Sequence, residues 1–161
     1  MIEPNSLPID SVDRAILASL ATNARRSGSA LAAEAGVSES TVSQRLRRLH
    51  DEGYLRGFHA DIDVAKLGMS VQALISIKLV KHVREDVDAF RSAAPRWPGV
   101  LAFFHTGGGD DYLLHVAARS AADLRDFMLT YLASHPAVAH TETNLVFEHV
   151  TGRGLEQLLS D

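Results

Sequence analysis

The first part of the chain repeats apolar residues at the spacing of an α-helix. The repeat consists of Ile9, Val12, Ile16 and Leu20. With Asp10 as its N-cap, it predicts a helix from about Ser11 to Ala24. A break follows at residues 25–28, and Ser29 can cap a short second helix that runs through Glu34. Two helices are therefore expected before residue 35.

A third helix is predicted from its N-cap, Ser38, to Gly53, whose freedom at positive φ ends it. Its buried face is formed by Val42, Leu46 and Leu49. A turn of about three residues containing Gly36 separates the second helix from the third, which is the spacing of a helix-turn-helix. A helix with an apolar back and a polar front suits a DNA major groove. The polar candidates for DNA contact are Ser38, Ser40, Thr41, Ser43, Gln44, Arg45, Arg47 and Arg48.

The alternative for this third helix is a solvated surface helix in a plain three-helix bundle. Gln44 could pair with adenine and an arginine with guanine, whereas Arg45 borders the apolar face and could form a salt bridge within the domain. The net charge of −4 does not decide between them, because residues 1–60 hold seven Lys or Arg and seven Asp or Glu. The whole −4 therefore belongs to residues 61–161. Phosphate binding depends on local basic clusters, so the negative total does not exclude DNA.

From Ser70 the apolar period changes from about four residues to two. The pattern predicts strands at 71–79, 100–105, 112–118 and 138–150, helices near 83–94 and 124–132, and a short C-terminal helix near 155–159. The order βαββαβ is the ferredoxin-like split βαβ motif, one antiparallel sheet with helices on one face. The other face must be covered, and a second copy of the sheet can cover it, so the pattern predicts a dimer.

The composition fits an α+β protein with two small domains. Of the 161 residues, 46% are hydrophobic and 22% charged, which is enough to bury a core. The lack of cysteine excludes disulfides, thiolate zinc sites and cysteine nucleophiles. We find no secretory signal and no stretch approaching 18 apolar residues, and expect a cytoplasmic protein without membrane contact. The expected parts are a helix-turn-helix (winged-helix-like) domain over 1–54, a strand linker over 55–69 and an α/β ligand-binding and oligomerisation domain over 70–161. Within the linker, a weak apolar alternation predicts a strand over Leu55–Asp63, followed by a turn at Ala65–Gly68.

Segments from about Ile9 to Gly152 resemble, in this order, the Lrp/AsnC (feast/famine) family of transcriptional regulators. They are DRAILASL, LAAEAGVSESTVSQRLRRLHDEGYLRGFHADID, KLG, FFHTGGGDDYLLHV and HPAVAHTETNLVFEHV. The resemblance implies sequence-specific binding of double-stranded DNA by a homodimer, often assembled into tetramers or octamers. It also implies a response to an amino acid or related small metabolite bound between dimers. The turn after the second strand of the α/β domain would contribute to that effector pocket, and on this chain it comprises Gly107, Gly108, Gly109, Asp110 and Asp111.

This glycine-rich turn has two interpretations. In the first it is a tight hairpin, in which glycine adopts positive φ and aspartate bonds to its own backbone. In the second its N–H groups cradle a carboxylate while Asp110 or Asp111 meets an ammonium group. Thr141 and Thr143 share one face of the last strand and could line the same cleft, although paired threonines are usually plain cross-strand neighbours.

Metal binding and catalysis are the other functions to weigh. None of the eight histidines lies in an H-x-x-x-H or Cys-x-x-Cys pattern, so we interpret them as surface or internally satisfied residues and expect no metal. His105 with Asp110 or Asp111 could form an acid–base pair, but no nucleophile motif or phosphate loop accompanies them, and no enzyme is expected. The alternative function is an effector-binding or oligomerisation module, less readily an enzyme, with a non-functional DNA-binding domain.

Overall fold

The structure is a computed structural model that describes residues 9–80, 84–152 and 154–160. The chain divides into two compact units: the first combines Met1–Asp61 with Val150–Asp161, and the second is Ile62–His149. The end of the chain was expected in the α/β domain, but it groups with the first unit because α6 (Gly154–Ser160) packs on α1 (Ser11–Thr22). No helix in the described ranges is both long enough and apolar enough to span a membrane.

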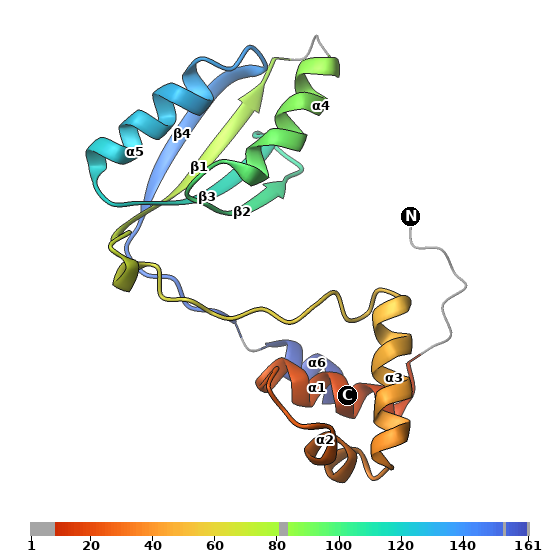
Figure 1. Ribbon diagram of the computed structural model, residues 1–161. Coiled ribbons are helices and arrows are strands. Elements are labelled where there is room, and N and C mark those ends of the chain that lie inside the picture. The colour runs from red at the N-terminus through yellow and green to blue at the C-terminus, as the bar shows by residue number, and fades with distance from the viewer. Residues whose placement is uncertain (1–8, 81–83, 153, 161) are drawn as a thin grey trace. The chain divides into compact units, whose positions relative to one another are not determined.

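The first unit contains a helix-turn-helix formed by α2 (Gly28–Ala35) and α3 (Glu39–Asp51) (Figure 1). Gly36 ends α2 at φ 66° and ψ 33°, a left-handed conformation that glycine adopts without strain. Ser38 then caps α3. The buried core consists of Ile16, Leu20, Leu31, Ala32, Val42 and Leu49. The predicted helix-turn-helix is confirmed.

Two caps determine where the first helices begin. Asp10 Oδ1 accepts a hydrogen bond from Asp13 N at 2.9 Å, and Asp13 Oδ2 accepts one from Asp10 N at 3.1 Å. This reciprocal capping box confirms the predicted start of α1. The cap of α2 is Ser27 rather than the predicted Ser29, whose hydroxyl lies 3.0 Å from that of Ser27.

The segment after α3 does not form the strand predicted over Leu55–Asp63. None of residues 54–63, all of which the structure describes, lies in a strand. At Gly57 the backbone has a φ of 155°, which differs from the φ of a β-strand. A strand also requires a neighbouring strand to satisfy its N–H and C=O groups. The prediction from weak alternation was therefore wrong. The predicted turn that follows is a 3₁₀ turn at Ala65–Leu67, which ends at Gly68 with φ 86°.

The second unit is an antiparallel four-stranded sheet with helices on one face. Its elements are β1 (Val71–Leu79), α4 (Arg84–Ala93), β2 (Val100–His105), β3 (Tyr112–Ala118), α5 (Ala121–Phe127) and β4 (Val138–Val146). The strands lie in the order β2-β3-β1-β4, each antiparallel to its neighbour. α5 continues as a π-helical segment at Met128–Ala133. The predicted α+β class with a ferredoxin-like βαββαβ domain is confirmed, although β4 ends four residues before the predicted position 150.

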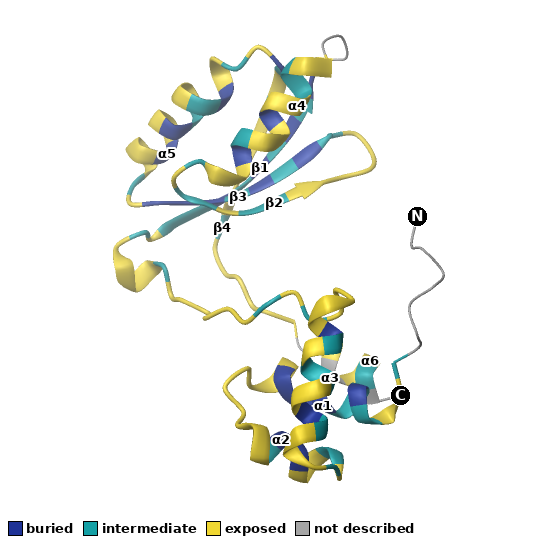
Figure 2. Cartoon of the chain, turned by 45° about the vertical axis from the view of Figure 1, so that its right-hand side comes forward, coloured by how far each residue is buried: buried dark blue, intermediate teal, exposed yellow. Residues whose placement is uncertain are grey.

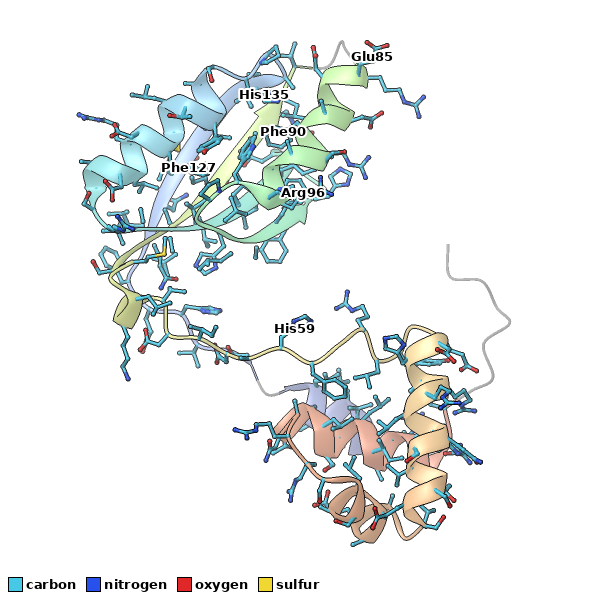
Figure 3. The ribbon with its side chains drawn as sticks, in the orientation of Figure 1. His59, Glu85, Phe90, Arg96, Phe127 and His135 are labelled. Atoms are coloured by element: carbon cyan, nitrogen blue, oxygen red, sulfur yellow. The ribbon has the colours of Figure 1, made fainter. Side chains whose placement is uncertain are left out.

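The core of this unit lies between the sheet and the helices α4 and α5, which cover the same face (Figures 1 and 2). Phe90 of α4 is fully buried and meets Trp97 edge-on, with ring centroids 5.5 Å apart. Figure 3 shows Phe90, Phe127 and His135 between the helices and the sheet. The most deeply buried strand residues on this face are Ala73, Ile75, Ile77, Leu114 and Val116.

Among the described residues of the second unit, no helix lies over the opposite face of the sheet (Figure 1). The strand register places Leu74 of β1 between His115 of β3 and Asn144 of β4, and it pairs Leu113 of β3 with Phe104 of β2. Leu74, Leu113 and His115 are half-buried, and Phe104 is 48% exposed. This open face therefore mixes apolar and polar side chains and is partly accessible in the single chain.

Candidate nucleic-acid interface and effector site

Helix α3 presents one polar stripe to solvent. Ser40, Ser43, Gln44 and Arg47 are all exposed, and they lie on one side of the helix because the steps between them are three, one and three residues. The opposite side is buried through Val42 and Leu49. Arg47 forms no ion pair or side-chain hydrogen bond with any residue in the described ranges. The structure thus leaves four of the predicted DNA-contact side chains available to a partner molecule.

The first turn of α3 uses the other hydroxyl groups of the predicted set for capping. Ser38 Oγ accepts a hydrogen bond from Thr41 N at 3.2 Å and lies 2.8 Å from Ser40 Oγ and 2.9 Å from Thr41 Oγ1. Glu39, which is exposed in the same turn, places a negative charge at the positive end of the helix. Ser38 and Thr41 therefore hold the start of the helix, and Ser40 is exposed on the stripe.

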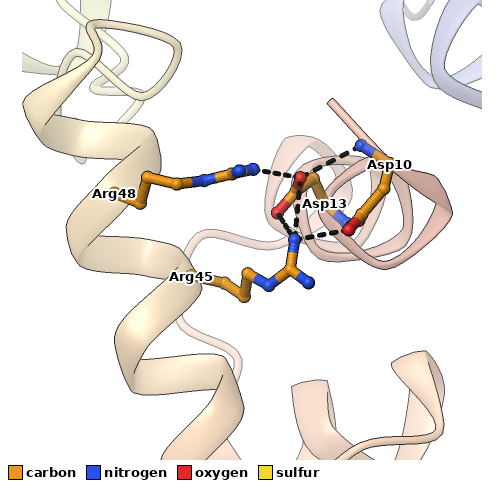
Figure 4. A network of polar contacts seen from close by, with 4 residues as sticks. All are labelled: Asp10, Asp13, Arg45 and Arg48. Carbon is orange, nitrogen blue, oxygen red and sulfur yellow. Dashed lines mark hydrogen bonds and ion pairs between the residues drawn. The ribbon is translucent and has the colours of Figure 1, made fainter. Parts of the chain in front are cut away.

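Arg45 and Arg48 point toward helix α1 instead of toward the stripe (Figure 4). Arg45 Nη1 donates to Asp10 Oδ2 at 2.5 Å and to both carboxylate oxygens of Asp13 at 3.2 Å. Arg48 Nη2 donates to Asp13 Oδ2. The backbone hydrogen bond from Asp13 and then the Arg45 side chain lower the pKa of Asp10, and the hydrogen bond to Asp10 raises the pKa of Arg45. The alternative considered for Arg45, a salt bridge within the domain, is what the structure has, and it extends to Arg48.

Asp13 is the buried ion-pair partner of Arg45 and Arg48 that the sequence did not predict. Its side chain is fully buried, and a buried carboxylate is stable only when hydrogen-bonded and paired with opposite charge. The signal was present, because an aspartate three residues after the N-cap Asp10 is the second half of a capping box. Its two arginine partners lie more than thirty residues away, so nothing local pointed to them.

The glycine-rich turn between β2 and β3 is closed by its own backbone. Thr106 N donates to Asp111 O at 2.9 Å, and Thr106 Oγ1 donates to Asp110 O at 2.9 Å. Gly108 has a φ of 135°, which favours glycine. A Cβ atom added at Gly107 or Gly109 would meet no atom within 4 Å, so packing within the chain does not require glycine at these two positions. The hairpin interpretation accounts for Gly108 but leaves its two neighbours without a packing reason.

The two aspartates of the turn have different surroundings. Asp111 Oδ2 accepts a hydrogen bond from Leu79 N at 2.8 Å, and its Oδ1 lies 3.7 Å from Lys78 Nζ. Lys78 Nζ also donates to Gly109 O. The Asp110 carboxylate is half-buried and bonds to no side chain or backbone group of the described residues. Asp111 therefore holds the turn to β1, and Asp110 is the carboxylate that could meet a ligand.

Thr141 and Thr143 lie on the helix-covered side of β4. The register pairs them with Ile77 and Ile75, which face the core, and Thr143 Oγ1 is 3.6 Å from Met128 Sδ. β1 lies between β4 and β3, so these threonines are two strands, or about 10 Å, from the strand that leads out of the turn. A single chain thus does not bring them into contact with the turn.

Four of the histidines considered for metal binding have protein partners. His115 Nε2 lies 2.8 Å from Gln72 Oε1, and the His115 ring meets that of His149 edge-on. His105 stacks on Tyr112, and His135 meets Phe90 edge-on. Burial, and to a lesser extent the neighbouring His149, lowers the pKa of His115. Within the described ranges no group of three or more His, Cys, Asp or Glu residues is placed to hold a metal ion.

Both units match domains of one protein family. Residues 9–50 match the AsnC-type helix-turn-helix domain, and residues 72–155 match the Lrp/AsnC ligand binding domain. Together with the fold, these matches define a class of protein: a helix-turn-helix transcriptional regulator with a ligand-binding domain. Proteins of this class regulate transcription and are not enzymes. The chain belongs to the Lrp/AsnC family.

The similarity extends over most of the chain. The chain is 42% identical over 144 residues to the HTH-type transcriptional regulator AldR of Mycolicibacterium smegmatis. This alignment covers 89% of this chain and 84% of AldR. The crystal structure of MtbAldR superposes with a TM-score of 0.76 at 39% identity, covering 89% of this chain and 98% of that one. The structure of the transcriptional regulator NMB0573 from Neisseria meningitidis, solved as a complex with L-Met, superposes with a TM-score of 0.82 at 27% identity. The superposition covers 90% of this chain and 94% of that one.

Proposed function

We propose that α3 enters the DNA major groove and that its exposed stripe contacts the operator. The observation that carries this proposal is the stripe itself, which projects from a helix whose opposite face is buried. Gln44 has the two-pronged amide that pairs with adenine, a contact worth about 1–3 kcal/mol of discrimination. Arg47 supplies the positive charge that binds phosphate, while Ser40 and Ser43 flank them. Arg45 and Arg48 stay outside this contact set because Asp10 and Asp13 hold them.

Alanine variants of Gln44 and Arg47 test this proposal on a duplex that the wild-type protein selects from a random library. Gln44→Ala should relax the sequence preference with little change in salt dependence. Arg47→Ala should weaken binding to every sequence and lower the salt slope by about one for each α3 on the DNA. Matched controls are Gln157→Ala on α6 and Arg25→Ala, both at exposed positions. If both stripe variants bind DNA as the controls do, α3 is not the reading element.

We infer that two copies pair through the open face of the sheet. A two-fold pair places two α3 helices on one side of the duplex, and half-sites of such dimers are spaced by turns of about 34–36 Å. The support is the half-buried, partly apolar row on that face, where Leu74, Leu113 and Phe104 are incompletely covered in the single chain.

A charge placed on the open face tests the pairing. Leu74→Glu should convert the dimer into monomers in sedimentation velocity at micromolar concentration, because an unpaired carboxylate would be buried between the sheets. Leu67→Glu, at a position that is 68% exposed in the 3₁₀ turn, is the control and should leave assembly unchanged. A wild-type protein that sediments as a monomer would refute the pairing.

We further propose that the β2–β3 turn contributes to the site of an amino-acid effector. The Asp110 carboxylate would bind the ammonium group of the effector, and the N–H groups of the glycines would bind the carboxylate of the effector. The free carboxylate of Asp110 and the absence of a packing reason for Gly107 and Gly109 support this assignment, as does the L-Met complex of the Neisseria meningitidis regulator. The effector would change assembly or operator affinity only by its differential affinity for the two states.

A thermal-shift screen of the twenty amino acids tests the effector site. An amino acid at about 100 times its Kd stabilises the protein by about 2.7 kcal/mol, which raises the Tm of a chain of this size by roughly 5–10 °C. Asp110→Asn should abolish that shift, while Asp126→Asn, on an exposed position of α5, should keep it. If no amino acid raises the Tm, the plain hairpin interpretation of the turn is favoured.

A further inference from the structure

The four charges between α1 and α3 cancel one another. Asp10 and Asp13 contribute two negative charges, and Arg45 and Arg48 contribute two positive ones (Figure 4). Asp13 lies at the centre with a side chain that is completely buried, whereas the two arginine side chains are only 29% and 28% exposed. The Nε atom of Arg48 is buried and has no hydrogen-bond partner among the described residues.

The network changes the charge that α3 offers to DNA. Three arginines occur within four residues of α3, which suggests a strongly basic recognition helix. Two of their guanidinium groups are turned back onto Asp13, and Arg47 keeps its charge on the exposed stripe. Non-specific binding to DNA grows with the number of phosphates that are neutralised, whereas base contacts add the sequence preference. A helix with fewer outward cations therefore binds random DNA more weakly relative to its operator.

We infer that Asp13 is a specificity-determining residue: it withholds Arg45 and Arg48 from the phosphate backbone and so keeps non-specific DNA binding weak. This inference rests on the proposed placement of α3 in the major groove. Asp10 assists by binding Arg45 from the N-cap of α1. Asp13 touches no base or phosphate in this scheme and acts through the two arginines.

Asp13→Asn removes the charge with little change in shape. The variant should bind a random-sequence 30-bp duplex more tightly than wild type, with a salt slope steeper by about 0.9 for each α3 on the DNA, because Arg48 loses its carboxylate partner while Arg45 still pairs with Asp10. At 0.1 M salt that slope corresponds to a gain of up to about 8-fold for each helix. Operator affinity should change less, so the ratio of operator to random affinity should fall. A purely structural loss would weaken both affinities and would not steepen the slope.

Arg45→Gln/Arg48→Gln provides a test that does not depend on removing Asp13. If the two arginines are withheld, this double variant should keep the wild-type salt slope on random DNA within about 0.3, whereas Arg47→Gln should lower it by about 0.9 for each α3. The triple variant Asp13→Asn/Arg45→Gln/Arg48→Gln should lose the gain of Asp13→Asn. Far-UV circular dichroism melts of each variant verify folding.

Two outcomes separate failure of this inference from failure of the proposed function. If Arg45→Gln/Arg48→Gln lowers the slope as much as Arg47→Gln does, the two arginines contact DNA despite the network, and the inference is overturned. If Arg47→Gln and Gln44→Ala both leave DNA binding unchanged, α3 is not in the interface, and the proposed function fails with it.

Discussion

Asp111 should be the residue on which the stability of the β2–β3 turn depends. Its carboxylate accepts a hydrogen bond from the backbone N–H of Leu79, a residue that is 7% exposed, and it pairs with Lys78 at 3.7 Å. In Asp111→Ala both interactions are lost, and the Leu79 N–H has no acceptor near the core. A buried donor left without a partner costs about 1–3 kcal/mol. The ion pair, whose two side chains are about one-third exposed, adds about 0–1 kcal/mol.

The expected loss of stability is therefore about 1–4 kcal/mol, which for a chain of this size lowers the Tm by roughly 2–16 °C. Asp111→Asn retains a neutral acceptor for Leu79 and should lose less. The single tryptophan, Trp97, gives a specific assay because it is partly buried in the core of the α/β unit and stacks on Tyr131. Its fluorescence during heating or urea titration reports the unfolding of this unit.

Asp110→Ala is the matched control for Asp111→Ala. It removes the same chemical group one position earlier, where the carboxylate bonds to no described residue, so its Tm should lie within about 1 °C of wild type in the absence of effector. Equal melting temperatures for the two variants would show that the Leu79 contact contributes nothing. The assignment of the turn-holding role to Asp111 and of the ligand role to Asp110 would then be refuted.

Two further predictions concern a histidine and a helix cap. Burial lowers the pKa of His115 below its ordinary 6.5, so the unfolded chain binds a proton before the folded chain does. Urea titrations from pH 7.5 to 5.5 should show that the free energy of unfolding falls as the pH drops below about 6.5. The variant His115→Gln should lessen that fall, and the exposed control His59→Gln should not. Ser38→Ala should cost about 0.5–2 kcal/mol in circular dichroism melts, because it removes the cap of α3, and the exposed control Ser43→Ala should cost little; equal losses would rule out the cap.

Local features of the sequence predicted most of the secondary structure. The start of α1 at Asp10, the turn at Gly36 and the start of α3 at Ser38 depend on residues within a few positions of one another. The order of strands and helices in the second unit follows from the change of apolar period, which is also local. Where the period was weak, over Leu55–Asp63, the prediction failed, because a strand depends on hydrogen bonds from another strand as well as on its own sequence.

The roles of similar neighbouring residues could be told apart only in the folded chain. Arg47 and Arg48 are adjacent, yet one faces solvent and the other binds Asp13 of another helix. Asp110 and Asp111 are equally indistinguishable in sequence, and the contact with Leu79 on β1 separates them.

The sequence by itself determined most of the helices and strands, the starts of α1 and α3, and that one helix carries a polar stripe. The tertiary structure alone decided which charges on that helix remain available, which aspartate of the turn is free, and that α6 joins the helix-turn-helix unit. The physical reason is the distance along the chain over which each interaction acts. Periodicity and capping act over one or two turns of chain, whereas an ion pair or a backbone contact between distant elements exists only once packing has fixed their distance and orientation.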